Sequence, residues 1–110
     1  MQVSASMIED MVTAIVQEVD PEYVYLFGSQ VSGNATYDSD VDLLVVEAET
    51  FGQQKKRWQE MQRIRKSLRK FRVAKDILLY SQHEFDEVKK SENHVVGHAV
   101  HNGRLMYERH

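Results

Sequence analysis

The chain has 110 residues, of which 14 are Lys or Arg and 17 are Asp or Glu, so its formal net charge is −3. That length allows one domain with one modest core, since domains usually hold roughly 100–200 residues. The hydrophobic and charged fractions, 42% and 28%, are typical of a globular protein and exclude a disordered chain. The absence of Cys excludes a disulfide scaffold, a Cys-based zinc site and thiol catalysis. No apolar stretch reaches the roughly 18 residues that span a membrane, and no signal peptide is visible, so we expect a cytoplasmic protein.

A helix is predicted over about residues 7–19, where apolar residues recur at helical spacing. Ser6 and Glu9 have the spacing of a capping box at its start. Pro21 ends the helix, because the residue before a proline avoids the helical region.

Two strands and a loop are predicted next. Residues 23–27 are aromatic and branched, which indicates a short strand. Residues 28–38 form a loop of Gly, Ser, Asn and Thr that is long for a hairpin, and such loops are often functional. The nearly continuous apolar run of residues 41–46 predicts a central strand with both faces covered.

A second long helix is predicted over about residues 53–70. Its apolar stripe includes Trp58 and Phe71, which we expect in the core, and basic residues fill the other face. Ten of the 14 basic residues lie in the range 55–75, where Glu60 is the only acid. ATP phosphates, RNA or an acidic partner could bind this face, but a solvated basic face is the simpler interpretation.

The remaining elements complete the fold class. They are a strand over residues 73–80, a short helix opened by a Ser81–Glu84 capping box, a helix from an Asn93 cap through His101, and a strand over residues 104–107. This order predicts an α/β (α+β) protein, with a mixed sheet and helices packed against it in a single domain over residues 1–110.

Three acidic residues are the candidates for catalysis. Asp40 and Asp42 are two residues apart, so in a strand both carboxylates project from the same face. At ~4 Å and an effective dielectric near 20, their repulsion costs on the order of 4 kcal/mol, which favours a bound proton or cation. Hard oxygen ligands favour Mg²⁺ or Mn²⁺. If the strand of Asp76 is a neighbour, the three acids could hold two cations for a phosphoryl-type displacement.

The loop before the acids adds a second feature. An Asp-x-Asp pair alone is more often a solvated strand end, and we leave the nearby Asp38 in that class. Gly28-Ser29 directly follows a strand and is expected to open a short helix. Gly lets a phosphate approach the backbone, and the free amides and the Ser29 hydroxyl can donate to its oxygens.

These features together resemble a known family. Gly28-Ser29, ten intervening residues and Asp40-Val-Asp42 resemble the signature of the DNA polymerase β-like nucleotidyltransferase superfamily. The resemblance to its minimal nucleotidyltransferase (MNT) branch rests on residues 25–46 with Gly33 and Ser39-Asp40, on residues 76–81 as the third-acid strand, and on residues 102–107 as the C-terminal end. It therefore covers nearly the whole chain.

The resemblance implies a polymerase β-like palm and a set of roles. The expected metal ligands and catalytic residues are Asp40, Asp42 and Asp76, and the expected nucleotide-binding residues are Gly28, Ser29 and Ser39. Asp76 would also help to activate the attacking hydroxyl. Attack on the α-phosphorus of ATP, with Mg²⁺ or Mn²⁺ as cofactor, would release pyrophosphate. Many family members carry Arg where this chain has Gln30 and Ser32, which removes charge that would assist the triphosphate.

The resemblance also implies a partner. MNT proteins of this size resemble antitoxins whose partner is a helical HEPN-domain ribonuclease, which they silence by adding AMP to a tyrosine. Two alternatives remain open: a transferase acting on a small molecule such as an aminoglycoside, and an antitoxin that acts by binding alone with a relic metal site. A homodimer is an alternative to the hetero-oligomer, and neither membrane binding nor direct nucleic-acid binding is expected.

Three histidines have the spacing of metal ligands. His94, His98 and His101 lie at i, i+4 and i+7 of the last predicted helix. No carboxylate or fourth ligand accompanies them, so we prefer solvated or interface histidines.

Overall fold

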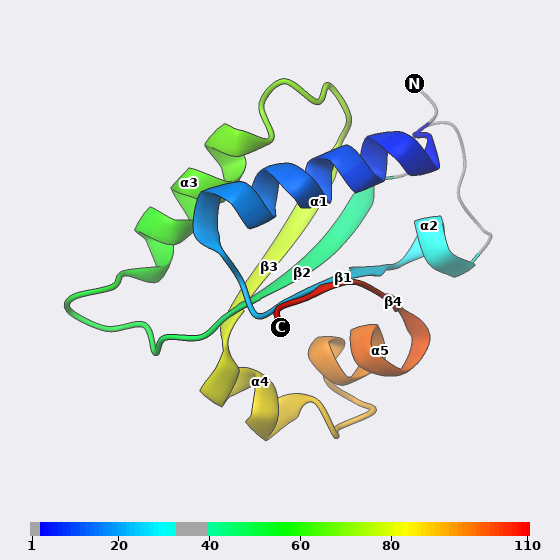
Figure 1. Ribbon diagram of the computed structural model, residues 1–110. Coiled ribbons are helices and arrows are strands. Elements are labelled where there is room, and N and C mark those ends of the chain that lie inside the picture. Colours follow the sequence, from blue (N-terminus) through cyan, green and yellow to red (C-terminus); the bar gives the residue numbers. More distant parts are fainter. Residues whose placement is uncertain (1–2, 33–39) are drawn as a thin grey trace.

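The structure is a computed structural model that describes residues 3–32 and 40–110. Within these residues, four strands form one mixed sheet in the order β3-β2-β1-β4, with five helices around it (Figure 1). The strands are β1 (Tyr23–Phe27), β2 (Val41–Glu47), β3 (Lys75–Ser81) and β4 (Arg104–Glu108). The helices are α1 (Ala5–Val19), α2 (Ser29–Ser32), α3 (Arg57–Ser67), α4 (Gln82–Val88) and α5 (Val95–Asn102). The α+β class and the predicted element order are confirmed, and α2 is the short helix expected after Gly28.

The sheet separates two apolar cores. Helices α1 and α3 cover one face, and α4 and α5 cover the other (Figure 1). Alternate residues of β2 enter opposite cores: Leu43 packs with α1 and α3, whereas Leu44 packs against α4 and α5. Both are fully buried, so the prediction of a central strand with two covered faces is confirmed.

Helix α1 begins two residues earlier than predicted. The Ser4 hydroxyl accepts a hydrogen bond from the Met7 N–H at 3.1 Å, so Ser4 is the N-cap and Ser6 lies inside the helix. The prediction of a Ser6–Glu9 capping box is therefore wrong. The predicted end is confirmed, because Asp20 caps the helix in the left-handed conformation with φ 48°.

Trp58 does not lie in the core, contrary to prediction, because its side chain is 62% exposed. Helix α3 is shorter than predicted, and its buried stripe runs through Glu60 and Ile64 to Leu68, four residues apart. Trp58 is off this line and falls on the outer flank of the helix. Phe71 is partly buried and packs against the core, as predicted.

The two C-terminal helices have different caps. The Ser81–Glu84 capping box of α4 forms as predicted, with the Glu84 N–H donating to the Ser81 hydroxyl at 3.2 Å and the Ser81 N–H donating to the Glu84 carboxylate at 2.9 Å. The cap of α5 is His94 rather than the predicted Asn93: its Nδ1 accepts from the Val96 N–H at 3.1 Å. No helix in the described part of the chain is both long and apolar enough to cross a bilayer.

Candidate active site

The acids of the second and third strands lie side by side. Strands β2 and β3 run parallel, with Asp42 directly opposite Asp76. Residues in register on neighbouring strands project from the same face, and Asp42 shares the face of Leu44, toward α4 and α5. Asp42 is half-buried and Asp76 is exposed. The two carboxylates thus stand together where both strands begin, as the sequence led us to expect if the strands were neighbours.

Negative charge accumulates at this point. Burial raises the pKa of Asp42, and the charges of Asp76 and then Asp40 raise it further. Asp40 immediately precedes β2 and is exposed. Such a group of oxygen ligands attracts a hard divalent cation, which would offset the repulsion. Among residues 3–32 and 40–110, no three acidic or histidine side chains are close enough to hold a metal as they stand, so binding would have to draw these carboxylates together.

Gly28 is required beside Asp42 for two reasons. Its φ of 76° is in the left-handed region, which strains other residues. A Cβ at this position would lie 2.2 Å from Asp42 Oδ2. The pairing of Phe27, the last residue of β1, with Asp42 brings the glycine to this place. That the glycine admits a phosphate stays a prediction, and the structure shows that the glycine makes room for the Asp42 carboxylate.

Helix α2 links the glycine turn to the acids. It starts at Ser29, directly after the turn, as predicted, and the Val31 and Ser32 N–H groups both donate to the Gly28 carbonyl at 3.1 Å. Gln30 Nε2 donates to the Asp40 backbone carbonyl at 3.5 Å, a long hydrogen bond that ties α2 to the start of β2. Sequence analysis did not find this tether, because it joins residues across the loop. Gly33, Asp38 and Ser39 lie outside the described residues.

The histidine face is occupied by structural contacts. His94 caps α5 and lies edge-on to Tyr80, with ring centroids 6.0 Å apart. His98 Nδ1 and Asn102 Nδ2 are hydrogen-bonded at 2.8 Å. Among the described residues, no group of three side chains that includes these histidines is placed to hold a metal ion.

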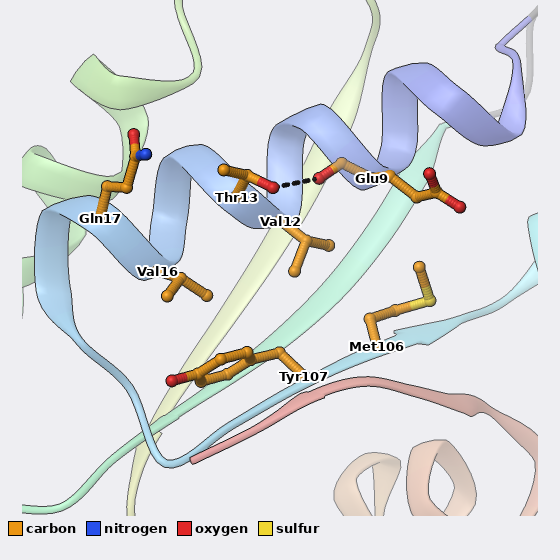
Figure 2. A pocket seen from close by; sticks show the side chains of 7 residues that line it. All are labelled: Glu9, Val12, Thr13, Val16, Gln17, Met106 and Tyr107. Carbon is orange, nitrogen blue, oxygen red and sulfur yellow. Dashed lines mark hydrogen bonds between the residues drawn. The ribbon is translucent and has the colours of Figure 1, made fainter. Parts of the chain in front are cut away.

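A hollow of about 410 Å³ lies between α1 and β4, on the other face of the sheet from the acids (Figure 2). The pairing of β1 with β4 is irregular after Val24, and both Met106 and Tyr107 pack on the α1 side. Val12 and Val16 line the opposite wall. This hollow is distinct from the candidate site, because its lining is mainly apolar and it lies on the other face of the sheet.

Two carboxylates in register beside a glycine turn, on a mixed sheet, are suited to metal-assisted phosphoryl transfer. Residues 9–110 match the model of the family described as "Polymerase beta, Nucleotidyltransferase". The chain therefore belongs to the polymerase beta nucleotidyltransferase family, whose members transfer nucleotides.

Several solved structures share the fold. A putative nucleotidyltransferase from Sulfolobus solfataricus is 24% identical over 99% of this chain and 93% of its own, with a TM-score of 0.56. A toxin–antitoxin crystallised with AMP-PNP is 22% identical over 92% of this chain and 73% of its own, with a TM-score of 0.55. A doubly substituted toxin–antitoxin MntA–HpeT is 20% identical over the same shares, with a TM-score of 0.54. No curated protein matches the chain.

Proposed function

We propose that the protein is a metal-dependent nucleotidyltransferase, a single domain over residues 1–110, that transfers AMP from ATP to a hydroxyl. The preferred acceptor is a tyrosine of a HEPN ribonuclease toxin, for which the protein acts as antitoxin. The observation that carries the proposal is the in-register pair of Asp42 and Asp76 beside Gly28. Family membership supports nucleotide transfer over other phosphoryl chemistry.

Two of the similar structures support the antitoxin role. Both are toxin–antitoxin proteins, and one was crystallised with AMP-PNP, an analogue of ATP. In the other, the two aspartates replaced by glutamate are separated by one residue, which is the spacing of Asp40 and Asp42 here.

The roles follow from the chemistry of the side chains. Asp40, Asp42 and Asp76 would hold Mg²⁺ or Mn²⁺, because their carboxylates are hard oxygen donors. When bound, the metal supplies positive charge that stabilises the phosphate oxygens and the leaving pyrophosphate. The acceptor oxygen forms a bond to the α-phosphorus while the bond from that phosphorus to the bridging oxygen of the β-phosphate breaks. Asp76, which is more exposed than Asp42, accepts the proton of the attacking hydroxyl. The triphosphate would be bound by Gly28, Ser29 and Ser39.

Label transfer tests the proposal. ATP labelled at the α-phosphate, with Mg²⁺ and a purified HEPN-domain partner, should label the partner, whereas ATP labelled at the γ-phosphate should not. Asp42→Asn and Asp76→Asn should each reduce labelling by at least about 100-fold, the scale for loss of a charge-stabilising group. Asp10→Asn, an exposed acid on α1, is the matched control and should not change the rate. Undiminished labelling by the Asp42 and Asp76 variants would refute the site.

A second candidate is an antitoxin that acts by binding alone. It is favoured by one observation, the neutral Gln30 and Ser32 in place of family arginines. Neutralisation of the partner that survives Asp40→Ala/Asp42→Ala would establish it. Labelling of a small hydroxyl compound without any protein partner would instead establish the small-molecule alternative.

A further inference from the structure

A line of long side chains runs along the outer flank of α3, the helix beside β3 in Figure 1. Trp58, Gln62, Arg65 and Arg69 recur at i, i+4, i+7 and i+11, which places them on one side of the helix and the turn that follows it. All four are exposed. Trp58, which we predicted in the core, lies exposed on this flank.

A groove separates this line from the outermost strand of the sheet. Its volume is about 430 Å³, and it is lined by Gln62, Arg65, Leu68, Arg69, Lys75 and Ile77. Leu68 and Ile77 are buried and provide apolar surface, while the two arginines are exposed. The groove therefore combines an apolar floor with cationic walls.

Within residues 3–32 and 40–110, no acidic side chain forms an ion pair with the arginines of the groove. Elsewhere on this segment, Arg57 pairs with Glu84 at 2.5 Å, and Arg63 contacts Glu60 at 3.2 Å. Arg65 and Arg69, by contrast, form no ion pair with any residue that the structure describes. Their guanidinium groups are available for bidentate binding of carboxylates.

We propose that the groove between α3 and β3 docks an acidic segment of the protein that accepts the nucleotide. The segment carries two carboxylates for Arg65 and Arg69 and an apolar side chain for the floor between them. This inference rests on the proposed function. Lys75 lines the groove, and the next residue of β3, Asp76, projects from the opposite face of the sheet. A protein bound in the groove thus lies just across the edge strand from the candidate site.

Two features favour an acidic protein over nucleic acid. The floor of Leu68 and Ile77 suits an apolar side chain and not a phosphate. An exposed tryptophan next to arginines is typical of the residues that dominate protein–protein binding.

A peptide probe tests the docking site. Trp58 is the only tryptophan in the chain, so its fluorescence reports on this flank directly. A blocked Glu-Leu-Glu-Leu-Glu peptide should change that emission and bind, and Arg65→Glu/Arg69→Glu should weaken binding at least about tenfold. Lys66→Glu/Lys70→Glu is the matched control: it has the same spacing and charge change on exposed residues that do not line the groove, and it should change affinity less than about threefold. Circular dichroism checks that both variants fold.

The outcomes separate this inference from the proposed function. No peptide binding, or equal weakening in the two double variants, would overturn the docking site. Tighter binding of an oligouridylate of about ten nucleotides would assign the groove to nucleic acid and overturn it too. If the wild type binds the peptide but transfers no AMP, the proposed function fails and the groove stands. If Arg65→Glu/Arg69→Glu transfers AMP to the partner with an unchanged KM, the docking site fails and the function stands.

Discussion

Lys55 Nζ lies 3.0 Å from Glu47 Oε1, at the end of β2 remote from Asp42, and the Glu47 side chain is only 1% exposed. The contact is short but is not aligned as a hydrogen bond, so among the described residues neither Glu47 oxygen has a hydrogen-bond donor. Burial, followed by the neighbouring Glu60 carboxyl, raises the pKa of Glu47 to about 7, and Lys55 opposes this rise. A buried carboxyl that ionises near neutral pH makes stability depend on pH.

The first prediction concerns that pH dependence. Between the ordinary pKa of 4.5 and about 7, the folded protein holds a proton on Glu47 that the unfolded chain has released. The free energy of unfolding should therefore fall as the pH rises through this window. Glu47→Gln cannot ionise, so between pH 5 and pH 8 the wild type should lose about 1–3 kcal/mol more than this variant. Urea denaturation at both pH values measures the difference.

Glu49→Gln provides the control, because Glu49 is two residues away and exposed. It should keep the wild-type pH dependence. A Glu47→Gln protein that loses as much stability as the wild type would show that another group is responsible.

The second prediction concerns the glycine turn. Gly28→Ala adds a Cβ that cannot coexist with Asp42 Oδ2 at 2.2 Å and strains a positive φ. We expect a loss of about 1–2 kcal/mol in unfolding free energy and at least about a 100-fold loss of AMP transfer, because the displaced carboxylate is a proposed metal ligand. Gly52→Ala, where a Cβ meets nothing within 4 Å, should leave both unchanged. Full activity of Gly28→Ala would show that AMP transfer does not require the glycine turn.

The third prediction sets stability against activity. Asp42→Asn removes a carboxylate that Asp76 and Asp40 repel, so in a chelating buffer the variant should be more stable than the wild type. The gain should be less than about 1 kcal/mol, because solvent screens these partly exposed groups. Added Mn²⁺ should raise the Tm of the wild type and not that of the variant. Calorimetry with and without Mn²⁺ tests this, and an equal rise in both would remove Asp42 from the ligand set.

The fourth prediction distinguishes two N-caps for α1. Ser4→Ala removes the acceptor of the Met7 N–H and should cost about 1 kcal/mol. Ser6→Ala, at the position that the sequence pattern favoured, should change stability by less than about 0.5 kcal/mol. Thermal unfolding of the two variants decides between them, and a larger effect at Ser6 would contradict the observed cap.

Local patterns predicted much of this fold because they are repeated along each element. The unbroken apolar run of β2 indicated burial on both faces, and Leu43 and Leu44 do enter opposite cores. The spacing of Asp40 and Asp42 indicated a shared face, although only the parallel pairing of β2 with β3 brings in Asp76.

The predictions that were wrong or missing depend on contacts between elements, which local sequence patterns do not indicate. Glu60 occupies a buried position of α3, where Arg63 pairs with its carboxylate at 3.2 Å, and Trp58 lies exposed on another side of the helix. The hydrogen bond from Gln30 to the Asp40 carbonyl joins residues ten apart in the sequence, a separation that no helix or strand periodicity indicates. Glu47 is buried beside Glu60 of α3, and no pattern near Glu47 in the sequence indicates this contact.

Strand β4 has a consequence for how the molecule is made. It pairs antiparallel to β1, from which residues 28–103 separate it in the sequence. During synthesis, one edge of β1 therefore remains unpaired until residues 104–108 have left the ribosome. Contacts of such large sequence separation slow folding, so the exposed edge of β1 can aggregate with other chains until β4 pairs with it.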